Sequence, residues 1–360
     1  MSALFTPLIL KSVTLRNRVV VSPMCQYSSE DGKATDWHLV HLGSRAIGGA
    51  GLVVAEATAV SPEGRITLGD AGLWSDAQVE PLARINRFVE QHGAVAGIQL
   101  GHAGRKASAQ RPWEGDKHLS PAEGAWPILA PSAVAFGANL PVAPKAMSKD
   151  EIARVRDDFA AAARRALAAG YRLLELHFAH GYLAHEFFSP LANQRSDQYG
   201  GSFANRCRFL VETFDAVRAA WPERYPLAVR LSVNDWAEGG VTVEESIELL
   251  RQLKARGLDV VDVSHGFATP DIAKIPWGPG FMVPTTSRIR REVGLPCGAG
   301  WMISDPAAAD AIVRDGHADV VILAREMLKD AYWPFHAAKA LGVEKPQKLL
   351  PVQYAHWLKR

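Results

Sequence analysis

The 360-residue sequence has little cysteine and almost no net charge. Its three cysteines, Cys25, Cys207 and Cys297, lie far apart, which argues against a disulfide framework and against a C-x-x-C metal or iron–sulfur site. A formal net charge of +2, with both signs interspersed, provides no basic stripe for nucleic acid and no acidic tail. These absences favour a protein of the reducing cytoplasm that acts on small molecules.

Long apolar runs are also missing. No stretch is long enough to span a bilayer, and the N-terminal residues 1–7 (MSALFTP) lack the basic and apolar regions of a secretory signal. We therefore expect no membrane association and a cytoplasmic location. Barrels with insertions often reach this length as one unit, and we expect residues 1–360 to form a single domain.

Short β-rich segments alternate with longer helical patterns along the chain. These segments are apolar on both faces, as are strands of a parallel sheet covered by helices. Eight consecutive pairs predict an α/β fold, the (β/α)8 TIM barrel. The predicted strands are 18–22, 52–57, 95–99, 173–177, 227–232, 260–264, 297–300 and 320–323. The predicted helices are 36–48, 76–91, 149–169, 203–220, 243–256, 285–293, 305–315 and 331–341.

Three further features complete the predicted architecture. Residues 1–17 are interpreted as a short hairpin that closes the N-terminal mouth of the barrel. A Pro- and Gly-rich insertion from Gly101 to Lys145 follows the third strand. The sequence Ser148-Lys-Asp-Glu151 is a capping box that begins the next helix, and Gly170 is typical of its end. A doubly wound open sheet is the alternative, but no G-x-G-x-x-G follows the first strand.

The C-terminal ends of the predicted strands carry hydrogen-bond donors and aromatic rings, and TIM-barrel enzymes place their chemistry at these ends. No lysine sits at a strand end, which argues against a Schiff-base aldolase. No carboxylate cluster gathers there and no His-x-His follows the first strand, which argues against a metallohydrolase, so we expect no metal. Such a rim suits a large planar anionic cofactor.

The strongest single motif is His177-Phe-Ala-His180-Gly-Tyr182, at the end of the fourth strand. Two imidazoles at i and i+3 can point to one side of a tight turn or first helical turn. Donors that converge there stabilise a carbonyl oxygen as it becomes an enolate, and Tyr182 can deliver a proton. The same spacing also occurs in histidines that only satisfy loop backbone, or in part of a metal site. The position in the barrel favours catalysis.

Three segments together resemble the Old Yellow Enzyme family, and within it the thermophilic-like branch with its xenobiotic reductases. They are residues 22–27 (SPMCQY), the motif 177–182 and residues 188–206 (FSPLANQRSDQYGGSFANR), and the match covers essentially the whole chain. Larger dienoyl-CoA reductases share the resemblance but carry a cysteine cluster and extra domains that this sequence lacks. The resemblance implies an FMN-dependent ene-reductase, in which NADPH or NADH reduces FMN. Hydride then passes to the β-carbon of an α,β-unsaturated carbonyl or nitro compound.

The resemblance also implies where FMN, tightly but not covalently bound, would lie on the rim. One edge of the flavin would contact Ser22, Pro23, Met24, Cys25 and Ala57. Gln99 and Arg230 would hydrogen-bond its pyrimidine ring, and Arg230 would favour the anionic reduced form. The phosphate would bind Arg325, near Gly300, Trp301 and Ala324. That position agrees independently with the common phosphate site of barrels, beside strands seven and eight.

For the substrate, the resemblance implies that His177 and His180 hold the oxygen while Tyr182 donates the proton. Cys25 would act as a catalytic residue by contacting the flavin and tuning its potential. Tyr27, Trp301 and Trp357 would complete the pocket. Trp357 would reach it from a neighbouring subunit, which implies a homodimer or larger assembly. A cofactor-free barrel that serves as an interaction scaffold is the alternative from another class.

Some positions depart from the common family pattern. Phe178 stands between the two histidines where a small residue is frequent, and Ala324 precedes Arg325 where glycine is usual. Neither removes a functional side chain, and their effects on the shape of the pocket and on the approach of the phosphate stay open. The Pro- and Gly-rich loop from Phe267 to Pro284 leaves the substrate preference open.

Overall fold

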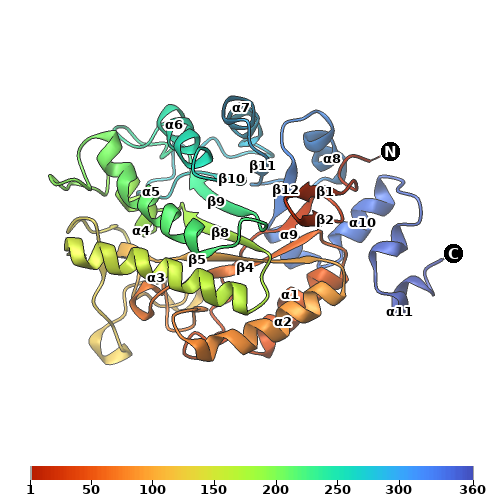
Figure 1. The fold of residues 1–360 in the computed structure, drawn as a ribbon, viewed down its shortest axis with the longest axis horizontal. Helices are drawn as coiled ribbons and strands as arrows, with labels where there is room; N and C mark the ends of the chain where they lie inside the picture. Colours follow the sequence, from red (N-terminus) through yellow and green to blue (C-terminus); the bar gives the residue numbers. More distant parts are fainter. Residues whose placement is uncertain (1, 360) are drawn as a thin grey trace.

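The computed structural model describes residues 2–359 and shows a closed barrel of eight parallel strands (Figure 1). The two terminal residues of the predicted 1–360 domain lie outside this range. Around the barrel the order is β10-β11-β12-β3-β4-β5-β8-β9, which closes the sheet and leaves no edge. The TIM-barrel prediction is confirmed and the open-sheet alternative is wrong. The strands are β3 Val19–Val21, β4 Leu52–Ala59, β5 Val95–Gly101, β8 Leu173–Phe178, β9 Leu227–Ser232, β10 Val260–Ser264, β11 Cys297–Ala299 and β12 Val320–Leu323.

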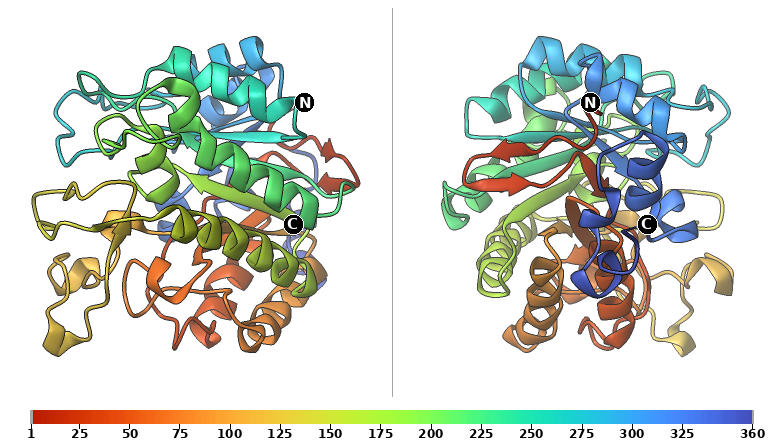
Figure 2. Two further views of the ribbon diagram at one scale, coloured as in Figure 1. Left: turned by 60° about the vertical axis from the view of Figure 1, so that its left-hand side comes forward. Right: turned by 90° about the vertical axis from the view of Figure 1, so that its right-hand side faces the viewer.

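Helices follow the strands and surround the barrel (Figures 1 and 2). They are α1 Asp36–Ile47, α2 Val79–Gln91, α3 Lys149–Ala168, α5 Phe203–Ala220, α6 Val243–Lys254, α7 Val283–Val293, α8 Pro306–Arg314 and α10 Trp333–Ala340. The predicted capping box is present at α3. Ser148 Oγ accepts from the backbone N–H of Glu151 at 3.2 Å, and the Glu151 carboxylate accepts from the backbone N–H of Ser148 at 2.8 Å. Three short helices were not predicted: α4 Leu183–Phe188, α9 Arg325–Lys329 and α11 Val352–Ala355.

The predicted N-terminal hairpin is also present. Strands β1 (Leu8–Leu10) and β2 (Val13–Leu15) pair antiparallel at the N-terminal end of the barrel. Leu10, Val13 and Leu15 pack against side chains from the first halves of the barrel strands, including Leu52 and Leu173. This apolar plug closes the end of the barrel opposite to the one where the strands finish.

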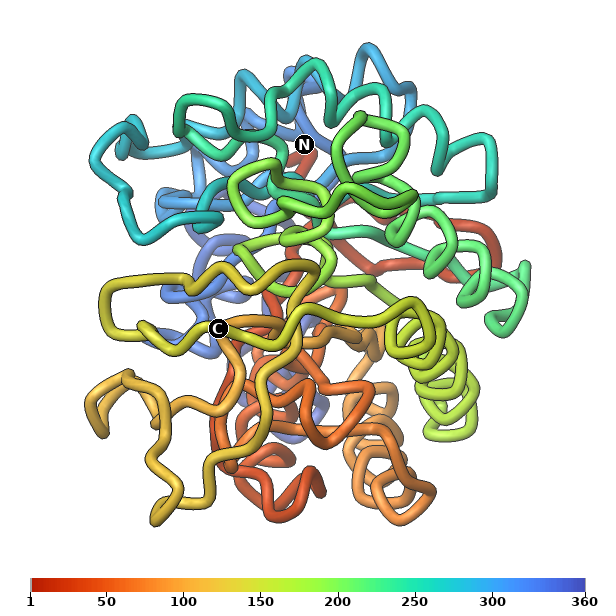
Figure 3. Tube along the Cα trace, turned by 90° about the vertical axis from the view of Figure 1, so that its left-hand side faces the viewer, coloured from red at the N-terminus to blue at the C-terminus, as the bar shows by residue number. Residues whose placement is uncertain are grey.

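The insertion after β5 forms irregular structure over the C-terminal end of the barrel, which Figure 3 shows end-on. It contains three short 3₁₀ helices and two short parallel strands. Their bounds are η3 Gly104–Lys106, η4 Pro112–Glu114, η5 Pro121–Glu123, β6 Leu129–Ala130 and β7 Lys145–Ala146. The insertion thus brings side chains from outside the βα repeat to this end of the barrel.

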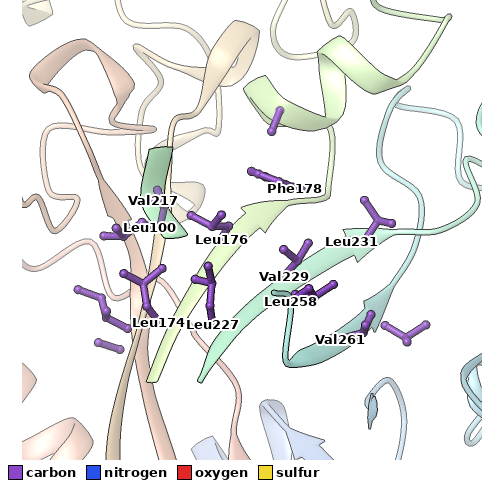
Figure 4. Packing of buried hydrophobic residues seen from close by; sticks show 14 of the residues in the cluster. Leu100, Leu174, Leu176, Phe178, Val217, Leu227, Val229, Leu231, Leu258 and Val261 are labelled. Carbon is purple, nitrogen blue, oxygen red and sulfur yellow. The ribbon is translucent and has the colours of Figure 1, made fainter. Parts of the chain in front are cut away.

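Side chains of the barrel strands alternate between the interior and the surrounding helices. In Figure 4, Leu176 and Phe178 of β8 lie in the outer core with Val229 of β9 and Val217 of α5. Phe178 is fully buried there, on the opposite face of β8 from His177. The sequence left the effect of Phe178 on the pocket open. Its ring packs in the outer core rather than facing the barrel interior.

Candidate active site

His177, His180 and Tyr182 form a compact cluster where β8 ends. The ring centroid of His177 lies 5.0 Å from that of His180 and 5.0 Å from that of Tyr182, both in edge-on contact. His177 is the inward-facing residue next to the last of β8, and Tyr182 is the N-cap residue of α4. The structure therefore brings together the three residues of the motif at the C-terminal end of the barrel.

A tight left-handed turn joins these residues. His180 and Gly181 have φ angles of 61° and 68°, and a Cβ atom at position 181 would collide with the carbonyl oxygen of Phe267. The Gly181 N–H donates to Nδ1 of His185 at 2.8 Å. Nε2 of His185 lies 2.9 Å from the carboxylate of Asp235, in a pair with no exposed side-chain surface. This buried pair holds the turn from beneath, and the sequence motif alone did not reveal it.

The environment keeps the cluster neutral. Burial lowers the pKa of His177 and of His180 well below the ordinary value, and the positive charge of Arg230 adds to the effect. Burial raises the pKa of Tyr182 well above its ordinary value. At neutral pH each imidazole therefore carries one N–H donor, and the phenol of Tyr182 keeps its proton.

Lys106 joins the site from the insertion, a residue that the strand-end argument missed. Its ammonium donates to the carbonyl oxygens of His180 at 2.7 Å and Phe267 at 3.0 Å, and lies 5.4 Å from the ring centroid of Tyr182. Burial lowers the pKa of Lys106 to about 7. Lys106 follows β5 by five residues, so its position in the first loop segment after a strand was the available signal.

Two cavities lie at this end of the barrel. The inner cavity, of about 430 Å³, is lined by Ser22, Arg230, Pro279, Gly300, Trp301, Met302, Ile303, Ser304, Ile322, Leu323, Ala324, Arg325, Glu326 and Lys329. It contains six of the predicted cofactor residues. They lie directly after β3, on β9, after β11, and between the end of β12 and the start of α9. The outer cavity, of about 320 Å³, lies between the insertion and the loop after β10. Tyr27, Lys106, Phe136, Tyr182 and Phe267 are among its lining residues.

Two buried carboxylates lie in the barrel interior beside the predicted flavin residues. Arg230 forms an ion pair with Asp262 at 3.1 Å, and the Gln99 amide donates to Glu175 at 2.7 Å. Burial, with the nearby charge of Asp262, raises the pKa of Glu175 to about 8. Neither carboxylate was predicted. A charged residue at an inward position of an apolar strand, as in LLELHF and VVDVS, was the signal.

The remaining predicted residues surround the cluster from β3 and β4. Ala57 lines a small pocket together with His177 and Tyr182, and Tyr27 lines the outer cavity. Cys25 lines none of these cavities. Burial, with the charges of Glu56 and Asp70, raises the pKa of its thiol well above the ordinary value, so the thiol stays protonated. Pro23 and Met24 lie between Ser22 and Cys25 on the same segment, and neither lines the inner cavity.

Aromatic rings enclose the Trp301 side of the inner cavity. The centroid of His265, a fully buried side chain, lies 4.4 Å from that of Trp301 and 4.9 Å from that of Phe281. Phe267 stacks on Trp301 at 5.8 Å. Burial and Arg230 lower the pKa of His265 to about 4, so this ring is neutral at pH 7. The loop that the sequence left open thus packs directly behind the predicted substrate-binding tryptophan.

Known proteins match this chain over nearly its whole length. The model of the NADH:flavin oxidoreductase / NADH oxidase family matches residues 3–344. The chain is 45% identical to the NADPH dehydrogenase of Geobacillus sp. (strain WCH70) over 94% of both proteins. It is 43% identical to the NADPH dehydrogenase of Bacillus subtilis (strain 168) over 98% of both. The chain belongs to the Old Yellow Enzyme family of NADH:flavin oxidoreductases.

Solved structures agree with this membership. Morphinone reductase superposes with a TM-score of 0.79 at 28% identity, covering 95% of this chain and 90% of that one. The Old Yellow Enzyme homologue from Zymomonas mobilis superposes with a TM-score of 0.76 at 27% identity, covering 95% and 93%. As a member of the Old Yellow Enzyme family, the chain is an oxidoreductase that uses FMN, with NADPH or NADH as reductant.

The inner cavity fits the FMN of an Old Yellow Enzyme. Arg325 is exposed at the cavity and forms no ion pair within residues 2–359, so its guanidinium is free to neutralise a phosphate. Lys329, which lines the same cavity, is already paired with Glu326 at 2.8 Å. Arg230 and Ser22 face the cavity from the barrel strands. The donor set therefore matches a ligand with a polar ring system and an anionic end.

Within one chain, Trp357 lies away from this Old Yellow Enzyme site. It is 80% exposed in the C-terminal segment, which Figure 1 places toward the end of the barrel that carries the hairpin. Trp357 therefore cannot line the pocket of its own chain. Within residues 2–359, no group of three or more His, Cys, Asp or Glu side chains is arranged to hold a metal ion. No described helix combines the length and apolar character needed to cross a membrane.

Proposed function

We propose that the chain is an ene-reductase that acts on α,β-unsaturated carbonyl or nitro compounds. The observation that carries this proposal is the neutral cluster of His177, His180 and Tyr182 at the C-terminal end of the barrel. Tyr182 lines the outer cavity, and Arg230, the neighbour of His177 in the sheet, lines the inner one. Two imidazole N–H groups on one side of a turn can bind a single carbonyl or nitro oxygen. Each such donor stabilises a developing oxyanion by about 3 kcal/mol.

Bound FMN supplies the hydride chemistry, and the side chains of the protein bind and orient the substrate around it. His177 and His180 hold the oxygen and draw electron density from the double bond, so that the β-carbon accepts hydride. Tyr182 then donates its proton to the α-carbon. The raised pKa of Tyr182 keeps the phenol protonated at neutral pH until that step.

The predicted cofactor and substrate residues have separate roles in this proposal. Ser22 to Cys25, Ala57, Gln99 and Arg230 hold the flavin ring. A second group, Gly300, Trp301, Ala324 and Arg325, holds the ribityl phosphate. Tyr27 and Trp301 flank the substrate.

Two further predictions concern the assembly and the reductant. Because Trp357 is exposed and distant from its own site, we propose that it completes the pocket of a second copy, in a homodimer or a larger assembly. NADPH is the proposed reductant, since the relatives at 43% and 45% identity are NADPH dehydrogenases. We also keep a cytoplasmic location as a prediction.

The deciding experiment is a visible absorption titration of the purified protein without oxygen. NADPH should bleach the flavin band, and cyclohexenone should restore it. In Tyr182→Phe the bleaching should be unaltered while the return of the band slows. An unaltered rate of return in Tyr182→Phe would identify solvent as the proton source. A flavin band that NADPH bleaches but that neither an enone nor a nitroalkene restores would refute the proposed substrate class.

A further inference from the structure

Ser264 lies at the end of β10, fully buried, with two partners around one hydroxyl oxygen. Nε2 of His180 lies 2.6 Å from Ser264 Oγ, and Nε1 of Trp301 lies 3.1 Å from it. The proposed function gives roles to both rings, but it gives none to the hydroxyl that joins them.

The protons of this trio can be assigned by elimination. An indole N–H only donates, so Ser264 Oγ accepts from Trp301. The hydroxyl then has one proton to place, and among residues 2–359 its only other partner is Nε2 of His180. Nε2 must therefore accept, and a neutral His180 carries its own proton on Nδ1.

The opposite tautomer is disfavoured at this site. A proton on Nε2 of His180 would make both rings donate to the same oxygen. The hydroxyl proton of Ser264 would then be buried without an acceptor, an arrangement that folded proteins avoid. Ser264 is thus the group that distinguishes the two ring nitrogens of His180.

The proton on Nδ1 is the one that a substrate oxygen needs. Nδ1 of His180 has no protein partner within residues 2–359. In the ring of His177, Nδ1 is a buried atom without a partner, whereas Nε2 is not buried in this way. We propose that Ser264 is a positioning residue that locks His180 in the Nδ1–H tautomer, so that His180 presents a donor beside Nε2–H of His177. This inference rests on the proposed function.

Nitrogen NMR of the FMN-bound protein, with ¹⁵N-histidine, tests the tautomer directly. The His180 signals, assigned by their loss in His180→Asn, should show a protonated Nδ1 and an unprotonated Nε2. Ser264→Ala should mix or reverse this pattern, and Ser264→Thr should keep it. Ser232→Ala is the matched control. Ser232 Oγ accepts from the backbone N–H of His180 at 2.9 Å and donates to the Gly266 carbonyl at 3.1 Å, and it bonds neither ring nitrogen of His180. Its spectrum should show the wild-type tautomer.

Kinetics supply the second readout. With Ser264→Ala, kcat/KM for cyclohexenone should fall by at least about 10-fold, and Ser264→Thr should recover most of it. A wild-type His180 protonated on Nε2 would overturn the inference, as would an unchanged Nδ1–H in Ser264→Ala. If Ser264→Ala does not fold, the wild-type spectrum decides alone. Wild-type protein with Nδ1–H but no enone turnover would refute the proposed substrate class and leave the tautomer assignment standing.

Discussion

The two halves of β8 present opposite chemistry to the same barrel interior. Leu173, Glu175 and His177 alternate along the inward face of one six-residue strand. Leu173, in the first half, packs with the N-terminal hairpin in an apolar layer. Glu175 and His177, in the second half, lie among Arg230, Gln99 and the neutral imidazoles. The apolar lower layer stabilises the fold, whereas the upper layer holds buried polar groups, of which Nδ1 of His177 has no hydrogen-bond partner within residues 2–359.

The largest effect, on kcat/KM, should come from removing the two imidazoles of the upper layer. Replacing His177 and His180 together by alanine removes two donors of about 3 kcal/mol each, so kcat/KM for an enone should fall by roughly 10⁴-fold. Flavin content and melting temperature should change little. Steady-state kinetics and the absorption ratio of flavin to protein measure both. Equal losses of flavin and of activity would show that the histidines are structural.

The matched change in the lower layer is Leu173→Ala, four residues earlier on the same face. Leu173 is 3% exposed, and truncating a buried leucine typically lowers the free energy of unfolding by roughly 3 kcal/mol. Urea unfolding should show this loss, while kcat at 20 °C stays near the wild-type value. A large loss of activity in the folded Leu173→Ala protein would contradict the separation of the two layers.

The sequence could predict this separation only in part. Strand periodicity predicted the barrel, and the motif at residues 177–182 pointed to the cluster of His177, His180 and Tyr182 at the end of β8. Simple alternation along β8 and β10 also predicts Glu175 and Asp262 in the barrel interior and Phe178 on the helix side. Attention to strand ends alone missed these inward positions. Lys106 could have been noticed from its place in the first loop segment after β5, but its partners depend on the path of the insertion. His185 could not have been found, because its bond to Gly181 depends on a turn with two left-handed residues.

A smaller effect, on the affinity for FMN, is expected at Arg325 in the inner cavity. Arg325→Ala should raise the Kd for FMN by about 10- to 100-fold, since a charge-assisted bond of about 1.5–3 kcal/mol is lost. Lys329→Ala is the control, because Lys329 lines the same cavity but is paired with Glu326. Flavin fluorescence measures both values. Similar weakening in the two variants would indicate a general effect of charge rather than phosphate binding by Arg325.

The last effect is a pH dependence of stability at Glu186, which the apolar layer should not show. Glu186 of α4 is 1% exposed, and its carboxylate accepts from the backbone N–H of Arg105 at 2.8 Å. Burial raises the pKa of Glu186 to about 8. A raised pKa means that the folded state holds the proton more tightly than the unfolded state. The contribution of Glu186 to stability is therefore fully present below the ordinary pKa of a glutamate. It is lost as pH rises toward about 8, by roughly 1 kcal/mol per pH unit.

Glu186→Gln isolates this contribution, because an amide of the same shape does not titrate. Urea unfolding between pH 5 and 8 should show a shallower decline for the variant than for the wild type, with the curves diverging as pH rises. Leu173→Ala serves as the reference, since it should lower the wild-type curve by a constant amount. Parallel curves for Glu186→Gln and wild type would show that the pKa of Glu186 is not raised in the folded protein. They would also remove the contrast in titration between the two ends of the barrel.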